Sequence, residues 1–95
     1  MKNTFRDIKP GDIIYIVEVE TGVFSESKIS YVHKHNNYFG YSERRVFLEN
    51  GDHFEAPAMA IANRQNNKNY YVNKKFADDF LKERPKFLKK YGIII

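Results

Sequence analysis

The chain contains no cysteine among its 95 residues. It therefore has no disulfide framework, no thiol nucleophile and no zinc site built on thiolates. No apolar run approaches the roughly 20 residues that span a bilayer. The opening residues, MKNTFRDIKPGD, do not contain the apolar region of a signal peptide. These features predict a cytoplasmic protein that is not inserted in a membrane.

Glycine is scarce, and the five glycines stand apart from one another, so no glycine-rich loop is available to cradle phosphates. None of the serines lies in a glycine-flanked nucleophile elbow. The paired carboxylates Asp78 and Asp79 precede Lys82 by four and three residues, a spacing typical of ion pairs on a helix surface. Because no nucleophile or acid–base pair can be named, we expect the protein not to be an enzyme.

The three histidines offer an incomplete set of metal ligands. His33 and His35 would share one face of a strand, and His53 follows later in the chain. No carboxylate lies at a spacing that singles out a third ligand. We therefore expect no metal site and no cofactor.

The composition is 42% hydrophobic and 16% aromatic, which excludes a disordered chain. The length allows one domain with one modest core, and no linker divides residues 1–95. Residues 1–73 hold nine basic and nine acidic residues, whereas residues 74–95 hold seven basic and three acidic ones. The whole net charge of +4 therefore belongs to the C-terminal segment.

Residues 74–91 carry the clearest structural pattern. When they are placed on a helix, the apolar side chains occupy one arc of roughly 140°, as in a helix docked on a core. These side chains are Phe76, Ala77, Phe80, Leu81, Phe87, Leu88 and Tyr91. Pro85 falls on the solvent side, so we predict that the helix kinks there and continues. Asn73 is a favourable N-cap, and Gly92 is placed to end the helix.

The preceding residues predict strands. A turn at residues 9–12 leads into a β-branched stretch over 13–20, followed by strands over 23–34 and 38–48. In the first strand we expect Ile13, Tyr15, Val17 and Val19 to face the core, and we expect the helix to cover Ile14 and Ile16. This assignment follows from the alternation of side chains along a strand.

The pair Asn50-Gly51 is the strongest hairpin signal in the chain. A two-residue turn there places Phe47 opposite Phe54, on a strand that Pro57 ends. Residues 58–62 predict either a short strand or a single helical turn. Residues 63–69 predict a polar loop, and residues 70–72 a short closing strand.

Two stretches carry a resemblance to known proteins. They are residues 9–15, KPGDIIY, and residues 71–73, YVN, running into Ala77, Phe80 and Leu81. They resemble small phage and low-GC bacterial proteins, mostly without assigned function, that combine an SH3-like barrel with a C-terminal helix. The resemblance implies an α+β, mainly β fold: an antiparallel barrel of about five strands over residues 8–72, with the amphipathic helix packed on it.

The same resemblance implies an accessory protein that binds or inhibits a host protein. Tyrosine and arginine are enriched at binding hot spots, so the candidate partner-binding residues are Tyr38, Tyr41, Arg44, Arg45 and Tyr70. In the alternative, the basic helix face binds nucleic acid through Arg64, Lys75, Lys82, Lys86 and Lys89. Two simpler interpretations stay open, namely tyrosines that only cover the barrel and lysines that only solvate the helix.

The chain ends in three consecutive isoleucines, residues 93–95. We expect this apolar tail to add to a sheet edge, because β-branched residues favour strands and exposed apolar patches are rare. The edge belongs either to the same barrel or to a second copy of the chain, which would make a homodimer.

Overall fold

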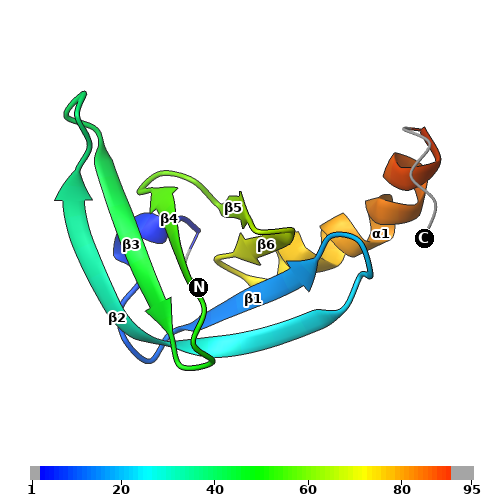
Figure 1. Cartoon of the computed structure of the whole chain (residues 1–95), viewed down its shortest axis with the longest axis horizontal. Coiled ribbons are helices and arrows are strands. Elements are labelled where there is room, and N and C mark those ends of the chain that lie inside the picture. Colours follow the sequence, from blue (N-terminus) through cyan, green and yellow to red (C-terminus); the bar gives the residue numbers. More distant parts are fainter. Residues whose placement is uncertain (1–2, 91–95) are drawn as a thin grey trace.

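The computed structural model describes residues 3–90, and the side chains of residues 3–83. Over this range the chain forms six antiparallel strands in the order β4-β3-β2-β1-β6-β5, which curl into a nearly closed barrel, and one C-terminal helix (Figure 1). The elements are η1 (Phe5–Asp7), β1 (Ile13–Glu18), β2 (Phe24–Asn36), β3 (Ser42–Leu48), β4 (His53–Pro57), β5 (Ala62–Gln65), β6 (Lys68–Tyr71) and α1 (Lys74–Lys90). The mainly β class with one helix is confirmed.

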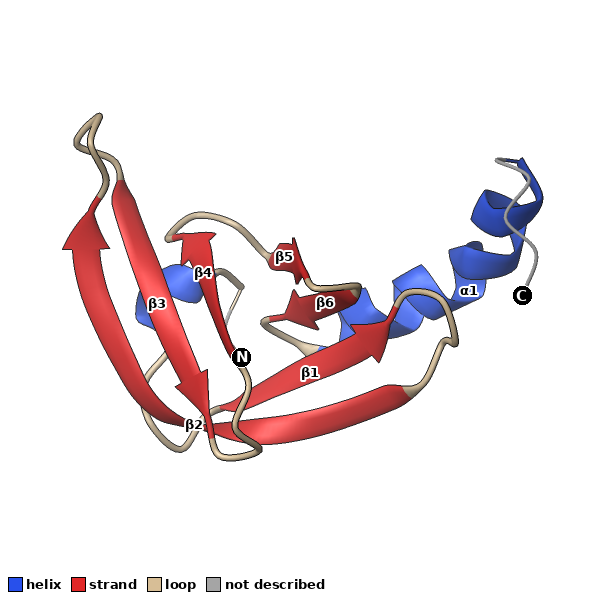
Figure 2. Cartoon of the chain, viewed as in Figure 1, coloured by secondary structure: helices blue, strands red, loops and turns tan. Residues whose placement is uncertain are grey.

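Strand β2 serves both halves of the sheet. Its first half pairs with β1 and its second half pairs with β3. The register shifts by one residue between Ile29 and Tyr31, and the Ser30 hydroxyl donates to the Phe47 carbonyl at 3.0 Å. Such a bulge bends and twists a strand. Figure 2 shows β2 as one long curved ribbon, and this curvature folds the sheet around the core.

The predicted core face of the first strand is wrong. Ile14 and Ile16 point into the barrel, where they are 0% and 2% exposed, whereas Ile13 and Tyr15 lie on the outer face. Val17 is also buried, but it lies outside the barrel and packs with Tyr71 and Ala77 beneath α1. Both faces of β1 are covered by other elements. Alternation alone therefore could not show which face is the interior.

The hairpin between β3 and β4 is one residue longer than predicted. The Gly51 amide donates to the Leu48 carbonyl at 3.1 Å, and the Leu48 amide donates to the Asp52 carbonyl at 2.9 Å. Gly51 has φ +94°, the left-handed conformation that completes a three-residue loop with a bulge. Phe47 therefore faces His53, and Phe54 faces Val46 inside the core.

The barrel has six strands where about five were predicted. The polar stretch read as a loop forms the hairpin of β5 and β6, which turns at Asn66 and Asn67 with φ +52° and +64°. Asparagine tolerates this left-handed conformation better than most residues. The barrel nearly closes where β5 meets β4, since the Gln65 side-chain amide donates to the His53 carbonyl at 3.3 Å.

A residue outside the predicted strands also belongs to the core. Phe5 lies on the 3₁₀ helix η1, is 0% exposed and packs edge-on against Phe54 with ring centroids 5.5 Å apart. Its amide donates to the Ala60 carbonyl at 3.0 Å. These contacts place η1 at one open end of the barrel, beside the end of β4.

Helix α1 begins as predicted. The Asn73 side chain accepts a hydrogen bond from the Phe76 amide at 3.3 Å, which confirms the N-cap. Phe76, Phe80 and Leu81 pack on the outer face of β1 and β6, so docking through these residues is confirmed. The helix continues through Pro85 to Lys90. No helix in the described range is long and apolar enough to cross a membrane.

Three predictions concern the C-terminal end of the chain. The side chain of Leu88, the helix end at Gly92 and the tail of residues 93–95 lie outside the described residues. The sheet-edge tail and the homodimer therefore stay predictions.

Candidate functional site

The turn between β2 and β3 presents exposed aromatic side chains. Tyr38, Phe39 and Tyr41 are 95%, 78% and 72% exposed, and we call these three residues the aromatic tip. The Asn37 carboxamide oxygen accepts hydrogen bonds from the Phe39 and Tyr41 amides at 2.9 and 3.0 Å. The backbone of the turn is therefore ordered while its rings face solvent. The third strand was predicted to begin at Tyr38, but β3 begins at Ser42, after this turn.

A groove of about 620 Å³ lies beside the aromatic tip. One wall consists of residues 41–44 at the start of β3, and another consists of residues 57–59 after β4. Arg6 of η1 and Asn37 complete the lining. Met59 is 67% exposed at this groove. The groove therefore combines apolar side chains with hydrogen-bonding groups.

Arg44 places a nearly buried positive charge in the wall of the groove. It is 7% exposed, and its guanidinium donates to the Ser42 hydroxyl at 2.7 Å, to the Glu43 carbonyl at 3.1 Å and to the Arg6 carbonyl at 3.3 and 3.4 Å. These acceptors satisfy most of its N–H groups, but none of them carries a full negative charge. A buried cation without a counter-charge is electrostatically unfavourable.

Two further cations lie near Arg44. Arg6 lines the same groove, and Lys34 is the cross-strand neighbour of Arg44 on β2. Neither of them, nor Arg44, forms an ion pair with a described side chain. These three cations outnumber Glu43, the one carboxylate among the residues that line the groove, so this end of the barrel carries an excess of positive charge.

The structure divides the predicted partner-binding residues among four places. Tyr38 and Tyr41 belong to the aromatic tip, and Arg44 is buried in the groove wall. Arg45 lies on the outer face of the sheet, where it pairs with Glu55. Tyr70 is a core residue. The groove thus unites Tyr41 and Arg44 from the predicted set. Arg6, Phe39 and Met59 were missed, because no pattern near them in the sequence indicates that they meet.

Tyr70 is 3% exposed, so its ring is not available to a partner. The ring stacks on Phe54 with centroids 4.4 Å apart, and the hydroxyl donates to the Asp52 carboxylate at 3.3 Å. Lys68 pairs with the same carboxylate at 3.0 Å. Burial, and then the charge of Asp52, raise the pKa of Tyr70 from 10.0 to about 12. These contacts give Tyr70 a structural role.

The residues of the nucleic-acid alternative lie elsewhere. Lys75 and Lys82 are exposed on α1, which projects at the end of the molecule opposite the aromatic tip (Figure 1). Arg64 is exposed on β5, and its Nε donates to the Asn69 side chain at 2.8 Å. The side chains of Lys86 and Lys89 lie outside the described residues.

All three histidines lie on one face of the sheet, the outer face of β2, β3 and β4. The register aligns this face in three cross-strand rows: Tyr31–Phe47–His53, His33–Arg45–Glu55 and His35–Glu43–Pro57. The rings of the first row contact one another at centroid distances of 5.9 Å. His33 stacks on His35 at 5.5 Å. This arrangement could not be read from the spacing of the histidines alone.

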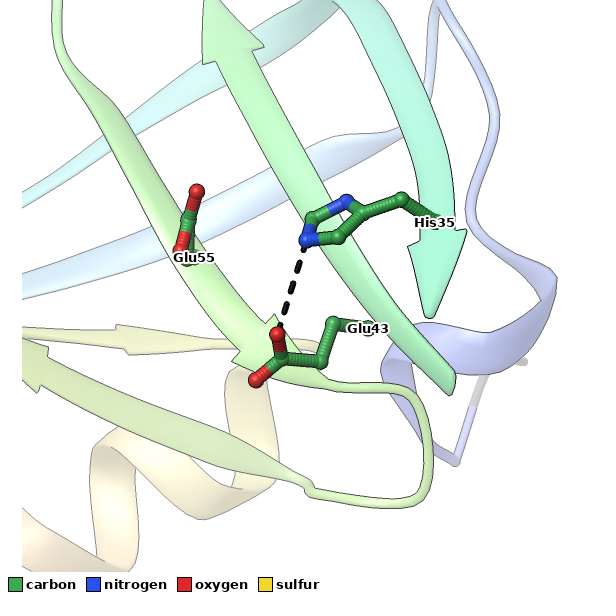
Figure 3. Close-up of side chains that lie close together, drawn as sticks. All are labelled: His35, Glu43 and Glu55. Atoms are coloured by element: carbon green, nitrogen blue, oxygen red, sulfur yellow. Dashed lines mark ion pairs between the residues drawn. The ribbon is translucent and has the colours of Figure 1, made fainter. Parts of the chain in front are cut away.

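His35, Glu43 and Glu55 form a cluster at one edge of this face (Figure 3). His35 Nε2 lies 3.4 Å from Glu43 Oε1, and one donor atom from each of the three residues lies within 4.8 Å of the others. The second ring nitrogen, His35 Nδ1, is buried and has no hydrogen-bond partner. The structure thus supplies the carboxylates that the sequence did not single out. The expected absence of a metal was drawn from the spacing of residues in the sequence, which does not show this cluster.

No protein-family model, no curated protein and no solved structure matches this chain. The resemblance of residues 9–15 and 71–73 to phage and low-GC bacterial proteins stays a prediction.

Proposed function

We propose that this protein is a non-catalytic binding module that holds an acidic segment of a protein partner in the groove beside the aromatic tip. The observation that carries the proposal is Arg44, a nearly buried guanidinium in the groove wall without an ion pair to any described side chain. Its four hydrogen bonds to the Ser42 hydroxyl and to the Glu43 and Arg6 carbonyls leave one of its five N–H groups for a ligand. A partner carboxylate there would form a charge-assisted hydrogen bond with a donor that is already held in place.

The surroundings of Arg44 favour a protein over a nucleic acid. Met59, Pro57 and the aromatic tip offer apolar and aromatic area of the kind that dominates protein interfaces. An acidic peptide with apolar neighbours can contact both the Arg44 guanidinium and this apolar area.

We also propose that the barrel belongs to the SH3-like class. This is supported by the long bent strand β2, which pairs with β1 along its first half and with β3 along its second half. The resemblance noted for residues 9–15 supports a phage-type accessory protein whose partner is a host component, in the cytoplasm.

The test captures partners from cell lysate by cross-linking, with three matched variants. Tyr41→Ala and Arg44→Met should each lose the partner, while Tyr31→Ala should retain it, because Tyr31 is exposed on the outer sheet face away from the groove. A hexaglutamate peptide should compete with the partner, and a hexalysine peptide should not. Capture that survives both groove variants would refute the proposal.

The nucleic-acid alternative rests on the charge excess of residues 74–95 and on the exposed Lys75 and Lys82. It predicts binding to generic duplex DNA with log K falling by roughly 0.9 per neutralised phosphate as log salt rises. Lys75→Glu with Lys82→Glu should abolish that binding and leave capture of a protein partner unchanged. The two functions are therefore separable in one set of variants.

A further inference from the structure

We propose that His35, Glu43 and Glu55 form a binding site for a divalent transition-metal cation, with Zn²⁺ as the best match. The three side chains come from three neighbouring strands, β2, β3 and β4, and converge on the same outer face of the sheet (Figure 3). This inference does not depend on the proposed binding of a protein partner.

The distances in the cluster are close to those of a metal site. Two ligands that each lie about 2.0–2.1 Å from zinc at a tetrahedral angle are about 3.4 Å apart. His35 Nε2 and Glu43 Oε1 are separated by 3.4 Å, which is longer than a good charge-assisted hydrogen bond. One carboxylate oxygen of Glu55 lies within 4.8 Å of a ligand atom of each of the other two residues. Glu55 is about half exposed on an edge strand, so a change of rotamer can bring its carboxylate closer.

The charges of the cluster also favour a cation. Glu43 and Glu55 bring two negative charges together. Among the described residues, His35 pairs with Glu43 and Arg45 pairs with Glu55. Arg45 contacts Oε1 of Glu55 through Nε at 2.6 Å and through Nη2, so it is the cation that competes with a metal for this carboxylate. With the imidazole counted as neutral, the four groups sum to −1. A dication would therefore bind to a cluster with excess negative charge.

The chemical types of the three ligands indicate which metal ions would bind. One imidazole and two carboxylates suit Zn²⁺, Mn²⁺ or Co²⁺, whereas Mg²⁺ and Ca²⁺ prefer six or more oxygen ligands. Three protein ligands leave a fourth tetrahedral position for water, as in open zinc sites. His33 stacks on His35 and restrains the orientation of the ligating ring.

One feature limits the expected affinity. Metal-binding histidines usually donate their second ring N–H to an acceptor, and loss of that partner costs about 10–100-fold in affinity. His35 Nδ1 has no such partner. We therefore expect binding that is specific but weaker than in structural zinc sites.

The test is isothermal titration of the full chain with ZnCl₂ and, separately, with MgCl₂. We expect one saturable zinc site, and binding of magnesium at least tenfold weaker. His35→Ala and Glu55→Gln should each weaken zinc binding at least tenfold. His53→Ala is the matched control, because it removes a histidine from the same face outside the cluster, and it should leave zinc binding unchanged. Circular dichroism melts confirm that each variant is folded.

A second variant tests the role of Arg45. Arg45→Gln removes the cation that competes for Glu55, so zinc should bind this variant more tightly than the natural chain. Zinc should also shift the ring NMR signals of His35 and leave those of His53 in place. Three results would each overturn the proposal: no saturable zinc binding, equal binding of magnesium, or equal losses in His35→Ala and His53→Ala.

Discussion

The pair of Tyr70 and Asp52 allows a quantitative prediction about alkaline stability. The Tyr70 hydroxyl donates to Asp52 at 3.3 Å from a ring that is stacked on Phe54 in the core. Burial and the Asp52 charge raise the pKa of Tyr70 to about 12 in the folded protein. In the unfolded chain a tyrosine has a pKa of about 10. The unfolded chain therefore releases the Tyr70 proton first as the pH rises.

The sign of the effect follows from this order. Below about pH 10 both states keep the proton, so the contribution of Tyr70 to stability is fully present. Between about pH 10 and pH 12 only the unfolded chain loses the proton, and the free energy of unfolding falls. Two pKa units correspond to at most about 2.7 kcal/mol. Because the Asp52 carboxylate is partly exposed, water screens part of this energy, and we expect a loss of about 1–2 kcal/mol.

The assay is urea unfolding of the natural chain and of Tyr70→Phe at a series of pH values. Near pH 8 the variant should be about 1 kcal/mol less stable, because it lacks the hydrogen bond to Asp52. Near pH 11 this difference should vanish or change sign, because phenylalanine cannot ionise. Tyr31→Phe is the control, since Tyr31 is 54% exposed and should leave the pH dependence unchanged. Parallel pH dependence of the natural chain and Tyr70→Phe would refute the reasoning.

Three further changes test the fold. Phe80→Ala should lower the free energy of unfolding by about 2–3 kcal/mol, as urea melts would measure. This is less than the roughly 3–5 kcal/mol for a fully buried phenylalanine, because the Phe80 ring is only partly buried against Tyr71. Asn73→Ala should cost about 1 kcal/mol by removing the cap of α1, seen as an earlier thermal melt of the helical circular dichroism signal. Gly51→Ala should cost at least about 1 kcal/mol, because φ is +94° there, and a melt unchanged from the natural chain would contradict that assignment.

The helix was predictable because its sequence signals agree with one another. The arc of apolar residues, the N-cap at Asn73 and the charged outer face all indicate the same element, and the structure shows α1 from Lys74 to Lys90. The sequence pattern is sufficient to predict the buried face of a helix or strand when one face is buried and the other is exposed to solvent. Strand β1 does not meet that condition, since Ile16 lies inside the barrel and Val17 lies beneath the helix. Its interior face depends on tertiary packing.

The groove could not be predicted for a related reason. It forms where the start of β3, the residues after β4 and η1 come together. Arg44 and Arg6 are 38 residues apart in the chain, and the contact between them is a side-chain hydrogen bond to a backbone carbonyl. The docking of η1 depends in turn on Phe5 entering the barrel beside Phe54. No periodic pattern encodes such a contact, because a single aromatic residue in a short helix has no repeat.

The cluster of His35, Glu43 and Glu55 forms only because the loop between β3 and β4 has three residues instead of two. A two-residue turn at Asn50-Gly51 would pair Val46 with Glu55 and turn that carboxylate toward the core. The observed loop has one residue more, so Arg45 faces Glu55 and the carboxylate lies on the outer face beside His35. A shift of one residue moves every side chain of a strand to the opposite face. The left-handed conformation at Gly51 therefore decides both that Phe54 fills the core and that Glu55 is available as a ligand.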